Sequence, residues 1–261
     1  MLPQYLLELF IFAIGASIGS FLNVCIYRLP RSLSIISPPS ACPVCDNPIR
    51  PYDNIPILSY ILLAGRCRRC GLPISPRYPM VELVSGLCAI AVCARFGYTL
   101  QALVLFIFIS ALIVVIFIDI DHQIIPDVIS LPGIVLCFLA SVFVFNRPVA
   151  EPAAGILVGG GSLLLVAVTY RLLTGRDGMG GGDIKLLAMI GALCGWEGVL
   201  FTIFLSSLAG TLVGILLMVA QGRNLRLALP YGPFLSLSAI VYIFLGPDII
   251  HWYFNILNRI S

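Results

Sequence analysis

Eight long apolar runs divide the chain and leave few folds open to it. They lie near residues 5–27, 79–96, 99–118, 127–146, 153–173, 184–196, 198–220 and 231–246. A helix that crosses a bilayer needs about 20 apolar residues, and only the run at 184–196 is short enough to suggest a re-entrant segment. Charged residues make up 10% of the chain, against about 25% in soluble domains. We therefore predict an all-α polytopic membrane protein with about eight transmembrane helices.

The basic residues predict how these helices are oriented. With eight crossings and the N-terminus outside, the cytoplasmic loops are 28–78, 119–127, 171–185 and 221–230. These loops hold Arg28, Arg31, Arg50, Arg66, Arg68, Arg69, Arg77, Arg171, Arg176, Lys185, Arg223 and Arg226, whereas only Arg95, Arg147 and Arg259 lie elsewhere. This asymmetry follows the positive-inside rule. Seven crossings would place Arg223 and Arg226 outside, so eight crossings are preferred. The first nine residues lack a basic segment, so we expect no cleavable signal peptide. No nucleic-acid motif is present, and we expect no nucleic-acid partner.

The first predicted loop carries two pairs of cysteines. Cys42 and Cys45 form one pair and Cys67 and Cys70 the other, in the pattern C-x2-C-x21-C-x2-C. Four thiolates at this spacing suit a tetrahedral zinc ion with no open position, which is a structural site. A reducing cytoplasm disfavours disulfides. We therefore predict a zinc-binding loop, with redox pairs or unrelated cysteines as the alternatives. Its arginines at 66, 68 and 69 are expected to contact membrane lipid rather than a basic substrate.

Two carboxylates stand where apolar runs meet loops. Asp119 ends the third run, and Asp183 follows a glycine-rich stretch, residues 178–182, and begins the sixth. The predicted topology places both at the cytoplasmic edge of the bilayer. Carboxylates at membrane depth are costly and indicate function. Two carboxylates that share one proton can hydrolyse a peptide bond, and glycines beside one of them let an extended peptide approach. The alternative on charge alone is an ion-coupled transporter, although no internal repeat is present.

Other polar residues near the two acids, and small residues in the fifth run, are interpreted as follows. Asp121 lies about 200° round a helix from Asp119, so both cannot easily face one partner. Asp127 precedes an apolar run and is interpreted as an N-cap. His122 and Lys185 either tune the two acids or face the headgroups. Small residues in the fifth run, Gly155, Gly159, Gly160, Gly161 and Ser162, predict close helix packing.

Taken together, these motifs resemble those of the type IV prepilin peptidase family. Residues 118–127, IDIDHQIIPD, are similar to its first aspartate motif, and residues 180–183, GGGD, to the GxGD motif that it shares with presenilin-like proteases. Further similar stretches are 19–23, 27–30, both cysteine pairs, 52–56, 77–83 and 230–234. The resemblance covers nearly the whole chain.

The resemblance implies an activity and its residues. The catalytic pair would be Asp119 and Asp183, with Asp121 as the alternative to Asp119. The substrates would be prepilins or pseudopilins, cleaved after a glycine at the cytoplasmic face of the inner membrane. The new N-terminus would then be methylated with S-adenosylmethionine, an activity linked to the four-cysteine loop. Because relatives with short loops lack methylation, a peptidase without it remains an alternative.

The resemblance also suggests a division of labour along the chain. Residues 1–96, with the loop at 28–78, would form the methyltransferase-linked part, and residues 97–261 a six-helix peptidase domain. No GxGxxG nucleotide loop is present. Asn23 and Glu82 are the polar candidates for binding the methyl donor, because both sit at cytoplasmic helix ends within matching motifs. Packing or capping roles are the alternative for each.

Overall fold

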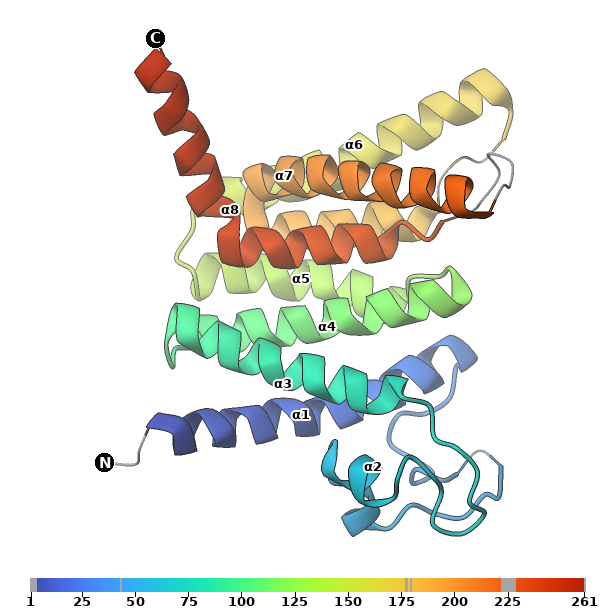
Figure 1. Cartoon of the computed structure of the whole chain (residues 1–261). Coiled ribbons are helices and arrows are strands. Elements are labelled where there is room, and N and C mark those ends of the chain that lie inside the picture. Colours follow the sequence, from blue (N-terminus) through green and yellow to red (C-terminus); the bar gives the residue numbers. More distant parts are fainter. Residues whose placement is uncertain (1–3, 43, 177, 179, 222–228, 261) are drawn as a thin grey trace. The chain divides into compact units, whose positions relative to one another are not determined.

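The computed structural model describes residues 4–42, 44–176, 178, 180–221 and 229–260, and these form helices joined by loops, with no strand (Figure 1). The main helices are α1 (Gln4–Arg28), α2 (Leu58–Leu62), α3 (Arg77–Phe96), α4 (Leu100–His122), α5 (Asp127–Phe143), α6 (Ala150–Thr174), α7 (Gly181–Gln221) and α8 (Gly232–Ile260). The predicted all-α class is confirmed. The chain forms two compact units, Met1–Val114 and Val115–Ser261, and each is described by itself.

Six of the described helices are long and apolar enough to cross a membrane, namely α1, α3, α4, α6, α7 and α8. Helix α7 covers two of the eight predicted runs, because its backbone leaves helical geometry at Gly195 (φ 73°, ψ −179°). Figure 1 shows the chain reversing direction there. Helix α5 is apolar but has 17 residues, which is at the short end for a span. The eight runs thus correspond to eight apolar helical segments. Their orientation stays a prediction, and Arg223 and Arg226 lie outside the described residues.

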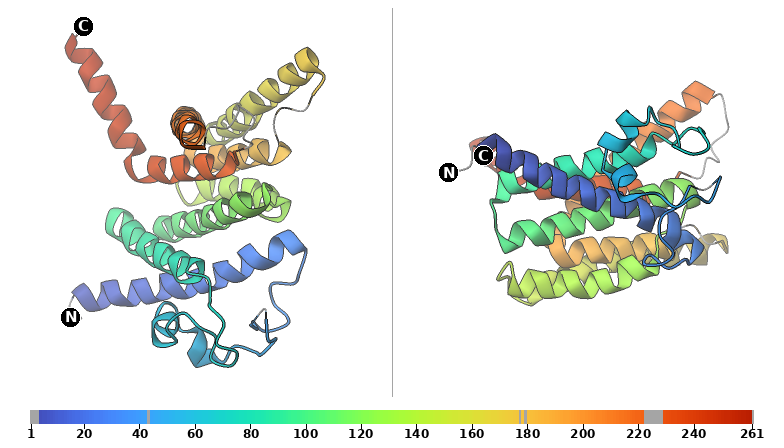
Figure 2. Two further views of the ribbon diagram at one scale, coloured as in Figure 1. Left: turned by 45° about the vertical axis from the view of Figure 1, so that its right-hand side comes forward. Right: turned by 90° about the horizontal axis from the view of Figure 1, so that it is seen from below.

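In the first unit, α1 and α3 run side by side (Figure 2). Their backbones come so close at Gly19 that a Cβ there would lie 2.7 Å from the Cα of Glu82. The hydroxyl of Ser85 on α3 donates a hydrogen bond to the carbonyl of Gly15 on α1 at 2.7 Å. Small residues of this kind hold membrane helices together by close packing, because lipid provides no hydrophobic force between them. The hairpin places both ends of the four-cysteine loop, residues 29–76, at one end of the unit.

In the second unit, α7 packs against α5, α6 and α8. A Cβ on Gly155 of α6 would lie 2.0 Å from the carbonyl oxygen of Gly191, and one on Gly159 would lie 2.5 Å from that of Leu187. The predicted small-residue packing is therefore confirmed at these two glycines, but it is wrong at Gly161, where a Cβ would meet nothing within 4 Å. At the break in α7, Arg147 donates to the carbonyl of Leu193 at 2.9 Å, which satisfies an otherwise orphaned helix-end acceptor.

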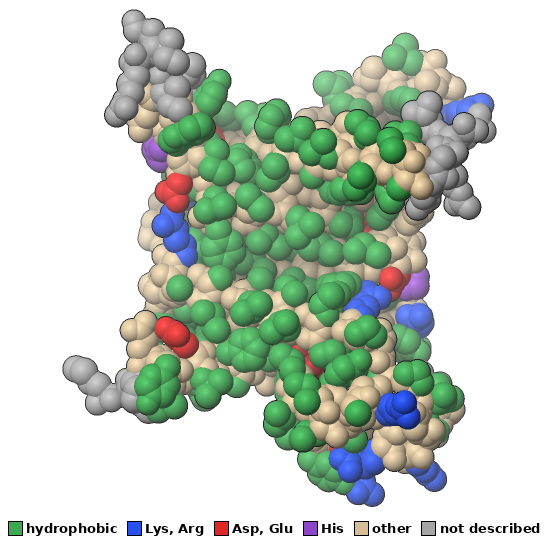
Figure 3. Space-filling model, in the orientation of Figure 1, with side chains coloured by type: hydrophobic (Ala, Val, Ile, Leu, Met, Phe, Trp, Pro, Cys, Tyr) green, Lys and Arg blue, Asp and Glu red, His purple; other side chains and the backbone are tan. Residues whose placement is uncertain are grey.

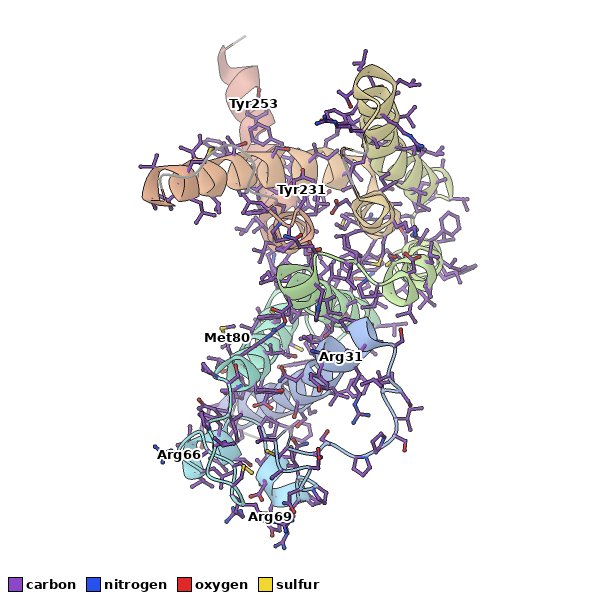
Figure 4. The ribbon with its side chains drawn as sticks, turned by 90° about the vertical axis from the view of Figure 1, so that its right-hand side faces the viewer. Arg31, Arg66, Arg69, Met80, Tyr231 and Tyr253 are labelled. Carbon is purple, nitrogen blue, oxygen red and sulfur yellow. The ribbon has the colours of Figure 1, made fainter. Side chains whose placement is uncertain are left out.

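The helix flanks expose large hydrophobic side chains (Figure 3). Leu157 and Phe204 are 73% and 70% exposed, and similar residues line the other helices. Apolar surface of this extent indicates contact with a membrane. Lys and Arg side chains gather instead on the four-cysteine loop, where Arg66 and Arg69 lie at its outer edge (Figures 3 and 4).

Candidate active site

Four helix ends meet at one end of the second unit: the end of α4 and the starts of α5, α7 and α8. Asp119 lies in the last turn of α4 and is only 5% exposed. The backbone N–H of Gly232, the first residue of α8, donates a hydrogen bond to its Oδ2 at 3.0 Å. The first amides of a helix have no partner within the helix, so this carboxylate satisfies one of them. The buried side chain of Asp119 therefore belongs to α4 and is hydrogen-bonded by the first residue of α8.

Asp183 lies in the first turn of α7 and is half-buried. It lines the same pocket as Asp119, a cavity of about 270 Å³. The other lining residues are Gln123, Ile124, Ile125, Asp127, Gly180, Gly181 and Gly182. The structure therefore brings the two predicted acids to one cavity, at the helix ends where the sequence placed them.

The glycine before Asp183 is required by its surroundings. A Cβ on Gly182 would lie 2.9 Å from the Cβ of Ile125, in the segment between α4 and α5. Real side chains do not approach so closely, so a larger residue would push α7 away from this segment. Met179 lies outside the described residues. The absence of a side chain at Gly182 thus lets the start of α7 pack directly against the segment that follows α4, the helix that carries Asp119.

The neighbouring polar residues take different places. Asp121 and His122 are exposed, and neither lines the pocket. Lys185 binds Asp127, with Nζ at 2.7 Å from Oδ1 and 2.8 Å from Oδ2. The N-cap interpretation of Asp127 is wrong, because Pro126 occupies the N-cap position and Asp127 is the first helical residue. An acid there is favourable next to the helix dipole, and its side chain ties α5 to α7.

The four cysteines of the loop in the first unit form a second cluster. The Sγ atoms of Cys42, Cys45, Cys67 and Cys70 all lie within 4.8 Å of one another, and those of Cys42 and Cys70 are 3.9 Å apart. Four sulfurs at about 2.3 Å from a tetrahedral zinc would be about 3.8 Å apart. The spacing of the described sulfurs therefore fits one zinc ion.

Each cysteine pair is built by the same turn. The amide of Asp46 donates to the carbonyl of Cys42, and the amide of Gly71 to that of Cys67, both at 2.9 Å. Asp46 and Gly71 both have positive φ, and a short antiparallel bridge closes each turn. Backbone N–H groups of Cys70 and Arg69 donate to the Cys67 sulfur and lower the pKa of its thiol to about 6. This favours the thiolate, which is the form that binds metal.

Two parts of the chain match models of known protein families. Residues 13–96 match the bacterial peptidase A24 N-terminal domain, and residues 106–215 match the type IV leader peptidase family. A protein of Pseudomonas putida named prepilin leader peptidase/N-methyltransferase is 36% identical, with 95% of this chain and 94% of that protein covered. The chain belongs to the type IV leader peptidase family. Proteins of the same name from Pseudomonas aeruginosa (35% identical, 92% and 91% covered) and Myxococcus xanthus (39%, 85% and 67%) are also similar. No solved structure gave a significant match.

Family membership and the apolar helices make this leader peptidase relative a multi-pass membrane protein. Asn23 and Glu82, the two residues predicted to bind the methyl donor, both lie in the first unit and are buried. The Asn23 side chain donates to the carbonyl of Tyr78 at 3.0 Å, and Glu82 Oε2 accepts the N–H of Ile57 at 2.7 Å. Each therefore has a structural partner. Their role in binding a methyl donor stays a prediction.

Sequence reasoning missed two contributors to the site. The Gly232 amide contacts Asp119 from a helix far along the chain, and the Ile125 side chain contacts the glycine motif from the segment between α4 and α5. The stretch at 230–234 carried a family resemblance at the start of an apolar run, on the predicted cytoplasmic side. That position was the available signal that it belongs beside Asp119.

Proposed function

We propose that this chain is a prepilin leader peptidase and N-methyltransferase, with Asp119 and Asp183 as the catalytic pair. The observation that carries the proposal is the shared cavity of the two acids at the meeting of four helix ends. Family membership supports the reaction class, because the relatives bear the name prepilin leader peptidase/N-methyltransferase. It also favours a peptidase over the ion-coupled transporter that the charges alone allowed.

The chemistry follows from one proton shared between two carboxyl groups. The ionised carboxylate takes a proton from water, and the water oxygen attacks the carbonyl carbon of the scissile peptide. The protonated carboxyl donates its proton to the carbonyl oxygen. When the tetrahedral intermediate collapses, the C–N bond breaks and the departing amine receives the proton that was taken from water. One hydroxyl of the intermediate returns its proton to the other carboxylate as the new carboxyl group forms. The pair is then back in its starting state with one shared proton.

The position of the site suits a substrate that is part helix and part extended peptide. Both acids lie at helix ends, beside the glycines at 180–182, where an extended chain can approach the backbone. We place this end at the cytoplasmic face of the inner membrane, because the predicted cytoplasmic loops hold most of the basic residues. Prepilins and pseudopilins, with a basic leader before an apolar helix, fit such a site.

The methyltransferase half is assigned to the first unit. Zinc held by Cys42, Cys45, Cys67 and Cys70 would fix the loop over the α1–α3 hairpin. S-adenosylmethionine would supply the methyl group for the new N-terminal amine. We assign Asn23 and Glu82 as its candidate binding residues, and the arginines of the loop as contacts to membrane lipid. The functional division lies near residue 96.

The proposal is tested by incubating the purified protein in lipid with a synthetic substrate that has a basic leader, a Gly-Phe junction and an apolar helix. Mass spectrometry should detect the released leader and, when S-adenosylmethionine is present, one added methyl group on the new N-terminus. Cleavage without methylation would support the peptidase that lacks the second activity. Absence of both products with folded, zinc-loaded protein would overturn the proposal.

A further inference from the structure

Tyr231 precedes the glycine whose amide binds Asp119, and its hydroxyl is held by two serines. The Tyr231 hydroxyl lies 2.8 Å from Oγ of Ser206 and 3.3 Å from Oγ of Ser207, both in the second segment of α7. Figure 4 shows Tyr231 beside the α7 ribbon. Ser206 is fully buried. Ser207 is exposed, so the phenol hydroxyl bridges one buried and one exposed serine of the same helix. A tyrosine hydroxyl with two such partners is restrained in position.

The three hydroxyl groups form one connected cluster with a carbonyl at its end. Ser206 Oγ lies 3.1 Å from the carbonyl oxygen of Ile203, to which it can donate its single hydrogen. With that hydrogen on the carbonyl, Tyr231 donates to Ser206 and its own oxygen accepts from Ser207. A directed chain of hydroxyls of this kind is mutually reinforcing and fixes the rotation of each group. The tyrosine ring is therefore anchored to α7.

The anchored residue directly precedes α8, which begins at Gly232. The carbonyl of Tyr231 accepts the N–H of Leu235 at 3.1 Å, which opens the hydrogen-bond ladder of the helix. The next amide along the chain is that of Gly232, which donates to Asp119 Oδ2 at 3.0 Å. Three helices, α4, α7 and α8, are thus linked through two consecutive residues. A rotation of Tyr231 would turn the Gly232 amide away from the carboxylate.

We infer that Tyr231 is a positioning residue for the peptidase reaction, which acts through its Ser206 and Ser207 bonds to hold the Gly232 amide on Asp119. This inference rests on the proposed function. An amide donor stabilises negative charge on the oxygen it touches. Asp119 is then the ionised member that activates water, and Asp183 the protonated member that donates to the carbonyl oxygen.

The other charged groups at the site do not offer Asp119 such a donor. Asp183 faces it from α7 as the second acid of the cavity, and Asp127 lines the cavity from α5 with Lys185 bound to it. Asp121 and His122 lie on α4 itself and are exposed outside the lining residues. The Gly232 amide is a donor that contacts the Asp119 carboxylate directly.

The test is the pH dependence of cleavage by the full-length protein in lipid, for wild type, Tyr231→Phe and Tyr242→Phe. Tyr242 is a matched control, because it lies on α8, the helix that Tyr231 precedes, and packs on α7 through Phe201, with ring centroids 5.5 Å apart. It stands about 16 Å further along the helix from Tyr231. Both variants keep the ring and lose one hydroxyl.

We expect Tyr231→Phe to lower kcat by about 10-fold or more, with KM little changed, because a loosened donor misplaces the reacting group. The acidic limb of its kcat/KM profile should move to higher pH, because the carboxylate loses support for its charge. Tyr242→Phe should keep the wild-type profile. A Ser206→Ala variant should resemble Tyr231→Phe, and the double variant should be no worse than either.

A Tyr231→Phe protein with wild-type kcat and an unmoved profile would overturn the inference while leaving the peptidase assignment intact. A fall in kcat with an unmoved profile would also overturn it, since only stability or packing would then be involved. Absence of cleavage by wild type would instead refute the proposed function. Thermal unfolding of each variant in the same lipid separates loss of fold from loss of positioning.

Discussion

Lys185 and Asp127 form an ion pair beside the candidate active site, with Nζ at 2.7 and 2.8 Å from the two carboxylate oxygens. The pair joins the fifth residue of α7 to the first residue of α5. Both side chains are partly exposed, at 35% and 56%. Lys185 lies two residues after Asp183, yet its ammonium group binds Asp127, which lines the cavity. The sequence had left open whether Lys185 tunes the acids.

We expect Lys185→Gln to lower the free energy of unfolding by no more than about 1 kcal/mol, because partly exposed ion pairs are weak. Cleavage should keep its wild-type pH profile. Thermal unfolding and pH–rate curves check this, with Asp127→Asn as the matched change on the other side of the pair. A shifted profile for Lys185→Gln but not for Asp127→Asn would show that Lys185 acts on the dyad.

Gly232→Ala should abolish most of the cleavage. An added Cβ would lie 2.7 Å from Oδ2 of Asp119 and 3.2 Å from its Cγ, so the carboxylate must move. A displacement of about 1 Å costs on the order of 100-fold in rate. Gly161→Ala is the control, because a Cβ there has open space within 4 Å. Equal cleavage by the two variants would contradict the role of α8 as part of the site.

Much of the fold could be predicted because lipid leaves the chain few choices. Spanning segments must satisfy their own backbone hydrogen bonds, so long apolar runs can only be helices. The separation of the runs ending at 196 and starting at 198 agrees with the break that the structure places at Gly195. The order of the helices alone predicted that Asp119 and Asp183 lie at the same end of their helices, and the structure has both in one cavity.

The contacts within the site could not be predicted in this way. Gly232 and Asp119 are 113 residues apart, and their hydrogen bond depends on how α8 packs in the second unit. Local capping preferences pointed to an N-cap at Asp127, but its side chain binds Lys185 on another helix. In both cases a tertiary partner decided the role of a group that the local sequence left ambiguous.

Zinc should bind in a ratio of about one ion per chain, and its loss should affect the two activities unequally. The four sulfurs are the only ligands that the described cluster needs for a closed tetrahedral site. Cys42→Ser, or removal of the metal by a chelator, should reduce methylation more than cleavage, since the loop and the aspartates belong to different units. Elemental analysis with both activity assays checks this. Equal loss of both activities, or protein without metal, would refute the separation.

Glu82 offers a way to distinguish donor binding from loop anchoring. Its Oε2 accepts the amide of Ile57, a β-branched residue held at φ 61°. Such a conformation costs about 1–3 kcal/mol and needs support from its surroundings. Glu82→Gln keeps an acceptor oxygen, whereas Glu82→Leu removes it.

If Glu82 only anchors the loop, Glu82→Gln should methylate normally and Glu82→Leu should lose methylation together with protection of the loop from protease. If Glu82 binds the methyl donor through its charge, Glu82→Gln should raise the KM for S-adenosylmethionine with the loop still protected. Cleavage should be retained in both variants. Methylation by Glu82→Leu at the wild-type rate would exclude both roles.

The most direct test of the catalytic pair is cleavage of the prepilin-like substrate by wild type, Asp119→Asn, Asp121→Asn and Asp183→Asn, all shown to be folded. Asp119 and Asp183 line one cavity, while Asp121 is exposed outside it. Loss of general acid–base catalysis costs about 10²–10⁴-fold. We predict such a loss for Asp119→Asn and Asp183→Asn, and near wild-type cleavage for Asp121→Asn. Normal cleavage by Asp119→Asn, with loss in Asp121→Asn, would contradict the assigned pair.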